Sequence, residues 1–320
     1  MESTQQIQNH LKSVKNIGQI TKAMELVAAT KMRKSQEVAL ASRPYSFAAF
    51  DLLAVLSQLE FNKFSSPFLE KRPVKNTLYV LVTSDKGLAG AFNSSVIRSF
   101  ENYATANKID LTAEANLFFS IGKKATAYLN KKNVRLVDKA ERVGDFITLE
   151  QVRPLIKKIT DGYLAGNWDR VIIFSTHFQN AFKQVVIPQD ILPVSFNNLK
   201  KIAEELIPIS GRYAELIKEK RVSFFNQKVN PSQVYLIEPS PQAVFENLVP
   251  HLLTMHLYHL ILEANASEHA ARRTVMKSAS DNADQLAEAL TLYYNKIRQA
   301  RITTEIVEII ASTESLNEIK

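Results

Sequence analysis

One stretch of the chain has the residue types of a phosphate site: "LVTSDKGLAGAFNSS", in which a strand leads through Gly87 and Gly90 toward a helix. Glycine loops before helices can bind phosphate, because the first helical turn presents free backbone N–H groups to an anion. The spacing fits neither the dinucleotide fingerprint nor the P-loop, since Lys86 precedes both glycines. We therefore favour a tight turn that allows close approach of helix and sheet, with phosphate binding as the alternative.

A second group of candidate residues consists of His251, His256 and His259, followed by Glu263 and His269. Two histidines on one helical face can bind zinc. However, His256 and His259 stand three residues apart, and the spacing and the general-base glutamate of the metalloprotease motif are lacking. Packed or interfacial histidines are the favoured interpretation. We predict no catalytic residue, no metal site and no bound cofactor.

Composition restricts the class of protein further. With 320 residues and 46% hydrophobic content, the chain can bury a substantial core. It has no cysteine, which excludes disulfides and thiolate chemistry. The net charge of +8 is not concentrated in one basic run, so nucleic-acid binding is not expected. The longest apolar region, Leu248–Ala264, is short and holds three histidines, so we expect contact with a membrane only through other proteins.

The middle of the chain alternates between strand-like and helix-like patterns. The β-rich runs are residues 76–84, 116–122, 170–178 and 184–194. Alternating strands and helices predict a Rossmann-like, open and mostly parallel α/β sheet, in a central domain at residues 73–239. Residues 195–232 are predicted to be an irregular insertion within it. A further strand in "QVYLIEP" leads to a helix with Ser240 as N-cap and Pro241 first, while Pro250 predicts a kink or a later helix start.

Both ends of the chain are predicted to be long helices, at residues 1–60 and 240–320. The N-terminal seam has an irregularity beside Gly18 and reads Ile7, Leu11, Val14, Ile17, Ile20, Met24 and Val27. The C-terminal seam reads Met276, Ala279, Ala283, Leu286, Leu290, Tyr293, Ile297, Ala300, Thr304 and Val307. Because each seam needs a partner, we predict that the two helices pair antiparallel as a shaft, on the order of 100 Å long at about 1.5 Å per residue.

Charged and polar residues decorate this predicted shaft. The N-terminal helix carries a basic collar, and antiparallel pairing is expected to place Met24 near Arg298, bringing two basic patches to one level. A solvated face is the usual explanation of such charges. The alternative is a surface that meets acidic loops of a partner. In the same way Arg298, Gln299 and Thr303 suggest polar contacts to something that surrounds the shaft.

Two long motifs resemble the terminal signatures of one known family. They are "SVKNIGQITKAMELVAATKMRKSQ" and "NASEHAARRTVMKSASDNADQLAEALTLYYNKIRQARITTEIVEII". Together with "VTSDKGLAGAFNSSV" and "YLIEPSPQAV", they resemble the gamma subunit of F-type ATP synthase of the bacterial type, over essentially the whole chain. The resemblance implies a non-catalytic central rotor shaft, which couples ion translocation through a membrane ring to ATP synthesis or hydrolysis at the beta subunits.

The resemblance also implies partners and contact residues. The expected partners are the alpha and beta subunits, the epsilon subunit and the ring of c subunits, with a peripheral location on the cytoplasmic face of the bacterial membrane. Contacts with beta subunits are expected from Lys22, Met24, Lys31, Arg33, Arg298, Gln299 and Thr303. Two alternatives stay open from the residues alone: a nucleotide-binding α/β enzyme with a coiled-coil arm, and a coiled-coil adaptor without a motor.

Overall fold

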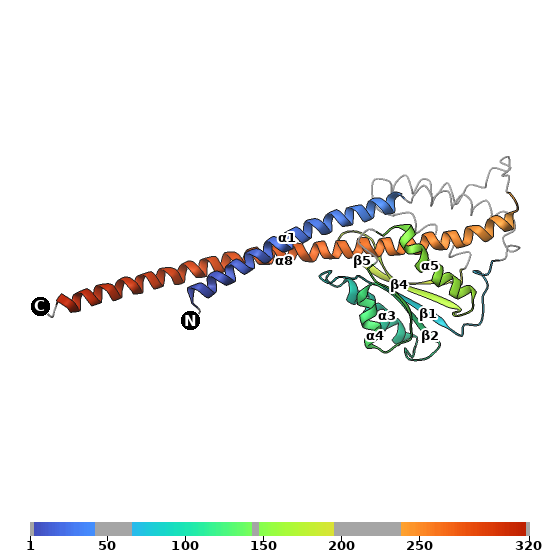
Figure 1. Ribbon diagram of the computed structural model, residues 1–320, viewed down its shortest axis with the longest axis horizontal. Coiled ribbons are helices and arrows are strands. Elements are labelled where there is room, and N and C mark those ends of the chain that lie inside the picture. The colour runs from blue at the N-terminus through green and yellow to red at the C-terminus, as the bar shows by residue number, and fades with distance from the viewer. Residues whose placement is uncertain (1–2, 42–65, 143–146, 195–237, 318–320) are drawn as a thin grey trace. The chain divides into compact units, whose positions relative to one another are not determined.

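The computed structural model describes residues 3–41, 66–142, 147–194 and 238–317. The chain divides into two compact units. The first, here called the coiled-coil unit, consists of Met1–Ala28 and Arg272–Lys320, and the second, the α/β unit, consists of Ala29–Ala271. Both long helices, α1 (Thr4–Ala41) and α8 (Pro241–Asn317), contribute residues to each unit (Figure 1).

A sheet with the strand order β3-β2-β1-β4-β5 forms the centre of the α/β unit, within the described residues. Its strands are β1 (Thr77–Val82), β2 (Asn116–Ile121), β3 (Leu136–Ala140), β4 (Arg170–Phe178) and β5 (Gln184–Leu192). β1 is parallel to β2 and β4, and β2 is parallel to β3, whereas β5 runs antiparallel to β4. β1 is buried along its whole length, as expected for a parallel strand covered on both faces. The predicted mostly parallel sheet is confirmed.

Helices cover both faces of the sheet (Figure 1). α3 (Phe92–Ala106) and α4 (Lys123–Lys131) pack on one face, where aromatic side chains dominate the core. The ring of Phe100 meets that of Phe174 edge to face, with centroids 5.3 Å apart. α5 (Leu149–Leu164) and the first part of α8 pack on the opposite face. The result is a three-layer arrangement with a separate core on each side of the sheet.

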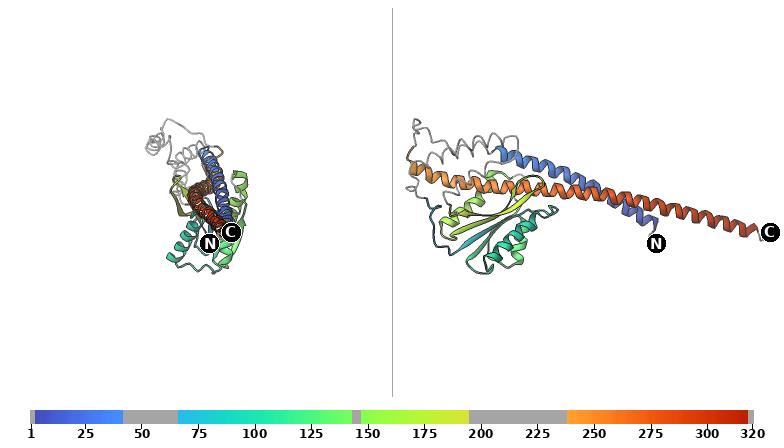
Figure 2. Two further views of the ribbon diagram at one scale, coloured as in Figure 1. Left: turned by 90° about the vertical axis from the view of Figure 1, so that its left-hand side faces the viewer. Right: turned by 180° about the vertical axis from the view of Figure 1, so that it is seen from behind.

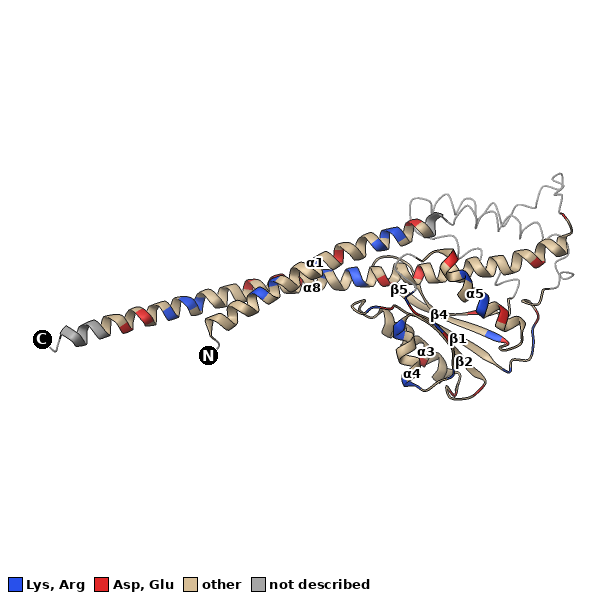
Figure 3. Cartoon of the chain, in the orientation of Figure 1, with Lys and Arg blue, Asp and Glu red and all other residues tan. Residues whose placement is uncertain are grey.

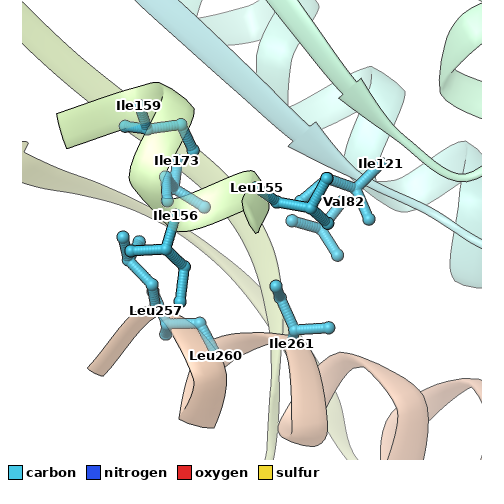
Figure 4. A pocket seen from close by; sticks show the side chains of 9 residues that line it. All are labelled: Val82, Ile121, Leu155, Ile156, Ile159, Ile173, Leu257, Leu260 and Ile261. Atoms are coloured by element: carbon cyan, nitrogen blue, oxygen red, sulfur yellow. The ribbon is translucent and has the colours of Figure 1, made fainter. Parts of the chain in front are cut away.

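The core beneath α5 and α8 mixes aliphatic and aromatic side chains and contains a small cavity with aliphatic walls (Figure 4). The residues that line it are Val82, Ile121, Leu155, Ile156, Ile159, Ile173, Leu257, Leu260 and Ile261. All of these side chains are hydrocarbon, so the cavity offers no polar group to orient a ligand. We therefore regard it as a packing defect between the sheet and its helical layer.

The four predicted β-rich runs coincide with β1, β2, β4 and β5, but the sequence prediction missed β3. This strand, "LVDKA", carries Asp138 and Lys139, and among its residues only Ala140 is fully buried. It lies at the edge of the described sheet, where charged side chains are tolerated and the apolar pattern is weak. Residues 233–237 of the strand predicted in "QVYLIEP" and the insertion predicted at 195–232 lie outside the described residues, and Glu238 and Pro239 form a bend.

α8 begins at Pro241, as predicted, and Ser240 caps it: the Ala243 N–H donates to the Ser240 hydroxyl at 3.2 Å. The helix continues without interruption through Pro250, so the expectation of a later helix start is wrong. Proline at this position removes one backbone donor from the helix. Packing of the surrounding turns on the sheet, through residues such as Leu252 and Leu253, offsets that loss. No helix in the described stretches is long and apolar enough to cross a membrane.

Candidate functional site in the paired terminal helices

The beginning of α1 and the end of α8 pair antiparallel in the coiled-coil unit, as the two seams predict. Val14 packs with Ala283 and Ala287. Nearer the N-terminus, the Arg301 guanidinium donates to the Thr4 hydroxyl at 3.3 Å. Residue numbers thus rise along one helix as they fall along the other, and the views in Figures 1 and 2 show the two ribbons of this unit running side by side.

The seam of α1 differs from the predicted one after Val14. Buried or half-buried positions continue through Gly18, Thr21, Glu25 and Ala28, in regular steps of four and three. The predicted seam residues Ile17, Ile20 and Val27 are instead 54%, 59% and 52% exposed. The irregularity predicted beside Gly18 was therefore wrong, because the helix turns small residues toward its partner and larger apolar ones outward.

Gly18 allows this close contact. A methyl group added at Gly18 would lie 3.4 Å from the Ala283 Cβ and 3.5 Å from the Asp284 Oδ1 atom. Two helices that meet through glycine and alanine can approach more closely than two that meet through leucine. Apolarity alone therefore does not mark the contact face of this helix pair.

In α8, about half of the predicted seam residues are buried or half-buried, and the others are exposed. Met276 and Ala283 are buried, but the intervening buried residue is Ser280, and Ala287 takes the place predicted for Leu286. The predicted seam ends too late, because Thr304 and Val307 are exposed. Since Arg301 is already level with Thr4, the last turns of α8 extend beyond the start of α1. They expose a set of apolar side chains: Ile302, Ile306, Val307, Ile309 and Ile310.

The expected meeting of Met24 and Arg298 does not occur. Gly18 lies opposite Ala283 and Thr4 opposite Arg301, so Met24 lies at the level of Lys277, about six turns from Arg298. The seams were predicted correctly as antiparallel, but the offset between them was not readable from the sequence. The two basic patches therefore stand at different levels.

Lys22 lies among acidic groups and not in a second basic patch. Its ammonium group contacts the Glu25 carboxylate at 2.9 Å. The hydrogen bond and the charge of Glu25, with smaller contributions from Asp281 and Asp284 of α8, raise the pKa of Lys22 above its usual value. Glu25 is itself buried at 8% exposure, so this ion pair neutralises a carboxylate in the seam.

Arg298, Gln299 and Thr303 are all exposed near the end of α8. The Thr303 hydroxyl donates to the Gln299 carbonyl at 3.0 Å, while Arg301 forms an ion pair with Glu305 at 2.8 Å. Basic residues precede acidic ones along this stretch of α8 (Figure 3). The structure thus presents these predicted contact residues on an accessible, strongly polar part of the helix.

The remaining predicted contact residues, Lys31 and Arg33, belong to the α/β unit. Arg33 is 81% exposed in its side chain and pairs with Glu37 at 3.2 Å. Lys31 is half-buried. The seven predicted residues therefore form three groups: two near the end of the α1 segment of the coiled-coil unit, three near the end of α8, and these two on the later part of α1.

The glycine loop after β1 is a turn whose polar groups bond within the protein. The Ser84 N–H donates to the Asn93 side chain at 2.9 Å, and the Asp85 carboxylate accepts from the Lys123 N–H at 3.1 Å. Leu88 and Gly90 both adopt positive φ values, of 61° and 55°, which a tight turn requires. This geometry favours the turn over the phosphate-site alternative.

The histidines of α8 fall into two environments. His251 is exposed, whereas His256, His259 and His269 are buried with at most 4% exposure. Within the described stretches, no three His, Asp or Glu side chains are grouped as a metal site would need. Burial, assisted by the neighbouring His259, lowers the pKa of His256 to about 3, so its imidazole is neutral at ordinary pH.

A polar contact that the sequence did not reveal joins strand β4 to α8. The His177 Nδ1 atom lies 2.6 Å from the Glu263 carboxylate, and the His259 Nε2 atom lies 3.2 Å from its other oxygen. Burial raises the pKa of Glu263, but the hydrogen bond with His177 and the nearby His259 imidazole outweigh it and leave the pKa below its usual value. Because 86 residues separate His177 from Glu263, no local pattern could have predicted the pair.

Comparison with known proteins points to one family. A family model described as ATP synthase matches residues 3–316. The chain is 33% identical to the ATP synthase gamma chain of Bdellovibrio bacteriovorus and 34% identical to that of Flavobacterium psychrophilum. Each alignment covers 99% of this chain and 99% of the relative.

Solved structures with the same fold come from rotors of mitochondrial ATP synthases. The rotor of the Euglena gracilis enzyme in rotational state 1 superimposes with a TM-score of 0.59 at 17% identity, covering 93% of this chain and 98% of that one. The central stalk and c-ring structure of the Tetrahymena thermophila enzyme gives 0.55 at 24% identity, with coverage of 82% and 99%. At these identities the likeness concerns the fold.

Proposed function

Because this chain belongs to the ATP synthase gamma-chain family and is a central-stalk subunit of that complex, we propose that it acts as the rotating shaft of a bacterial enzyme. In this proposal residues 1–60 and 240–320 form the shaft, and residues 73–239 form the central α/β domain. Ion flow through a membrane ring turns the shaft, and the shaft drives ATP synthesis at the beta subunits; hydrolysis reverses the cycle.

The observation that carries this proposal is the exposed surface of the coiled-coil unit. Ile17, Ile20, Leu26 and Val27 of α1 are each more than half exposed, as are several apolar residues at the end of α8. Exposed apolar side chains in such numbers mark a contact surface. A shaft enclosed by a ring of subunits needs such an apolar surface, because it contacts neighbours on every side without binding permanently to any one of them.

The mechanism follows from asymmetry. The pair of helices has different side chains on each face, whereas the three beta subunits around it are chemically identical to one another. Contacts that differ among the three sites shift the balance between their open and closed states differently. Each rotation step then passes a given set of contacts to the next site, which couples rotation to ATP affinity. The shaft itself performs no chemistry.

We assign the contacts with beta subunits to the residues whose positions fit this role. Arg298, Gln299 and Thr303 are accessible near the end of α8, where a charged loop of a surrounding subunit can reach them. A second set of proposed contacts lies on α1 and consists of Lys22, Met24, Lys31 and Arg33. Lys22 retains 57% side-chain exposure despite its ion pair with Glu25. Its charge is partly offset by that partner, so we rank the Arg298 group first.

The proposed partners are the alpha and beta subunits around the shaft, with the epsilon subunit and the c-subunit ring at the α/β domain. The location that goes with these proposed contacts is the cytoplasmic face of the membrane, which the protein would reach through the complex. We propose no role for nucleic acid, metal or cofactor.

Reversal of one charge tests the proposal. In the complex purified from membranes, Arg298→Glu is expected to lower ATP-driven ion pumping at least fivefold while ATP hydrolysis falls less, because the variant shaft no longer engages the acidic loops of its neighbours. Arg98→Glu, on the exposed surface of α3, makes the same charge change away from the shaft. It should leave the ratio of ion pumping to ATP hydrolysis unaltered. An unchanged pumping ratio in Arg298→Glu would count against the proposed contact.

A further inference from the structure

The attachment of α8 to the sheet has a polar component beside its aliphatic core. Three consecutive residues of β4 each bond to α8. The Ser175 hydroxyl donates to the Leu260 carbonyl at 3.0 Å, His177 pairs with Glu263 at 2.6 Å, and the Thr176 carbonyl accepts from Ser267 at 3.5 Å. We call this set, together with His259, the β4–α8 lock.

The lock is well shielded from water. Ser175, Thr176 and Ser267 are at most 4% exposed, and the Glu263 side chain is 13% exposed. Buried hydrogen bonds and ion pairs have strict geometry, because a small displacement leaves a buried polar group without its partner. Such groups add little to stability compared with aliphatic packing, but they fix one relative position of the elements that they join.

A separate bond holds the opposite side of the same helix. The Tyr258 hydroxyl donates to the Ile147 carbonyl, just before α5, at 3.0 Å. At about 100° per residue, Tyr258 points roughly opposite to Glu263 and Ser267 around the helix axis. Polar contacts on two opposing sides resist rotation of α8 about its own axis. Apolar packing also resists rotation, but because the hydrophobic effect is not directional it specifies one orientation less sharply than hydrogen bonds with fixed partners do.

α8 runs through both units, so its resistance to rotation on the sheet has a mechanical consequence. The locked part of the helix belongs to the α/β unit, and the same helix continues beyond Ala271 into the coiled-coil unit. If the protein is a shaft, any torque that enters at the α/β unit must pass into this helix without the helix turning on the sheet.

We propose that the β4–α8 lock is the torque-bearing connection between the α/β unit and the shaft, with His177 and Glu263 as its positioning residues. This proposal rests on the proposed rotary function. The lock neither binds ATP nor touches a catalytic site; it sets the rotational position of α8 on the sheet and thereby the torsional stiffness of the rotor.

The experiment measures stiffness in the assembled complex. Because the chain has no cysteine, Lys131→Cys on the exposed end of α4 provides a single attachment point on this chain for a rotation probe, in a complex whose other subunits are kept free of reactive cysteine. With the surrounding subunits fixed to a surface and ATP withdrawn, the angular fluctuation of the probe reports the stiffness of the path between them. His177→Ala should at least double the mean-square fluctuation, and His177→Asn should restore most of the stiffness, because its amide nitrogen can replace the Nδ1 donor.

Two comparisons make the result decisive. Asp138→Asn removes the exposed ion pair with Lys158 in the same unit, without touching α8, and should leave the fluctuation at the starting value. Glu263→Met, which keeps the side-chain length, is a second lock variant that is measured beside His177→Ala. Fluctuations equal to those of the parent complex in both lock variants would overturn the proposal.

Failure of the rotary function gives a different result. In that case the parent complex, with an intact lock, shows no ATP-driven rotation of the probe. Rotation in the parent together with unaltered stiffness in the lock variants rejects the lock and leaves the rotary proposal standing.

Discussion

The coiled-coil unit and the α/β unit place their apolar residues in opposite ways. In the α/β unit the large apolar side chains are inside: Phe100, Phe118 and Phe174 are fully buried. In the coiled-coil unit the seam around Gly18 is narrow and built from small residues, while Ile17 and Ile20 point outward. The first unit is a self-sufficient core. The second leaves apolar side chains available for contact with other proteins, as the proposed shaft inside a ring of subunits requires.

Removal of a large core side chain should produce the largest contrast between the units. Phe100→Ala is expected to destabilise the α/β unit by about 3–5 kcal/mol, because the ring is fully buried between two other aromatic rings. Ile20→Ala, on the exposed face of α1, should alter stability by less than about 0.5 kcal/mol. Fluorescence of Trp168, the single tryptophan and a buried residue of the α/β unit, reports its unfolding in urea. Equal losses in both variants would contradict the contrast.

Acid should weaken the α/β unit through its buried histidine. The pKa of His256 is about 3 in the folded chain and 6.5 when unfolded, so only the unfolded state takes up this proton between those values. The contribution of His256 to the free energy of unfolding is therefore fully present above pH 6.5. It is lost by about 1.4 kcal/mol per pH unit as the pH falls from 6.5 toward 3. The lowered pKa of Glu263 adds a loss of the same sign below its unfolded value of 4.5.

The matched variant for this prediction is His256→Leu, which fills the site without a titratable group. Urea titrations followed by Trp168 fluorescence between pH 7 and pH 4.5 should show a shallower pH dependence in the variant than in the parent. A parallel dependence in the two proteins would show that His256 does not take up its proton on unfolding.

Two glycine-to-alanine substitutions should change stability in opposite directions in the two units. A methyl group at Gly162 of α5 would lie 2.0 Å from the Trp168 ring, so Gly162→Ala is expected to cost about 1–3 kcal/mol. At Gly18 the nearest atom would be 3.4 Å away, which is an ordinary contact, and alanine is the better helix former. Gly18→Ala should therefore stabilise the helix pair by up to about 1 kcal/mol. Thermal unfolding followed by circular dichroism at 222 nm distinguishes a gain from a loss.

The smallest effect is expected from filling the aliphatic cavity beneath α8. Val82→Ile adds one methylene at its wall, which should stabilise the α/β unit by about 0.5–1 kcal/mol if the group enters the empty space (Figure 4). Val137→Ile, on an exposed position of β3, adds the same group at the surface and should have no measurable effect. A lower urea midpoint in Val82→Ile would mean that the wall cannot accept the added volume.

Much of the fold was predictable because local patterns determine it. Alternating strand and helix patterns located β1, β2, β4 and β5, and the Ser240–Pro241 pair located the start of α8. β3 escaped prediction because an edge strand with Asp138 and Lys139 lacks an apolar signature. The antiparallel pairing was also predictable, because two apolar seams at the ends of one chain need each other.

The details of the candidate site depend on long-range geometry and could not be predicted. Ile17 and Ile20 were assigned to the seam because they are apolar, but the contact runs through Gly18, where small size matters more than hydrophobicity. The offset that separates Met24 from Arg298 is set by the contact of Gly18 with Ala283. The His177–Glu263 pair likewise exists only after β4 and α8 have packed together.

The most direct test of the central claim is to watch this chain rotate. The complex is purified from membranes with a probe on Lys131→Cys, its surrounding subunits are fixed to a surface, and ATP is added. The account predicts continuous rotation in one direction that stops when ATP is withdrawn. Active ATP hydrolysis with a stationary probe would contradict it.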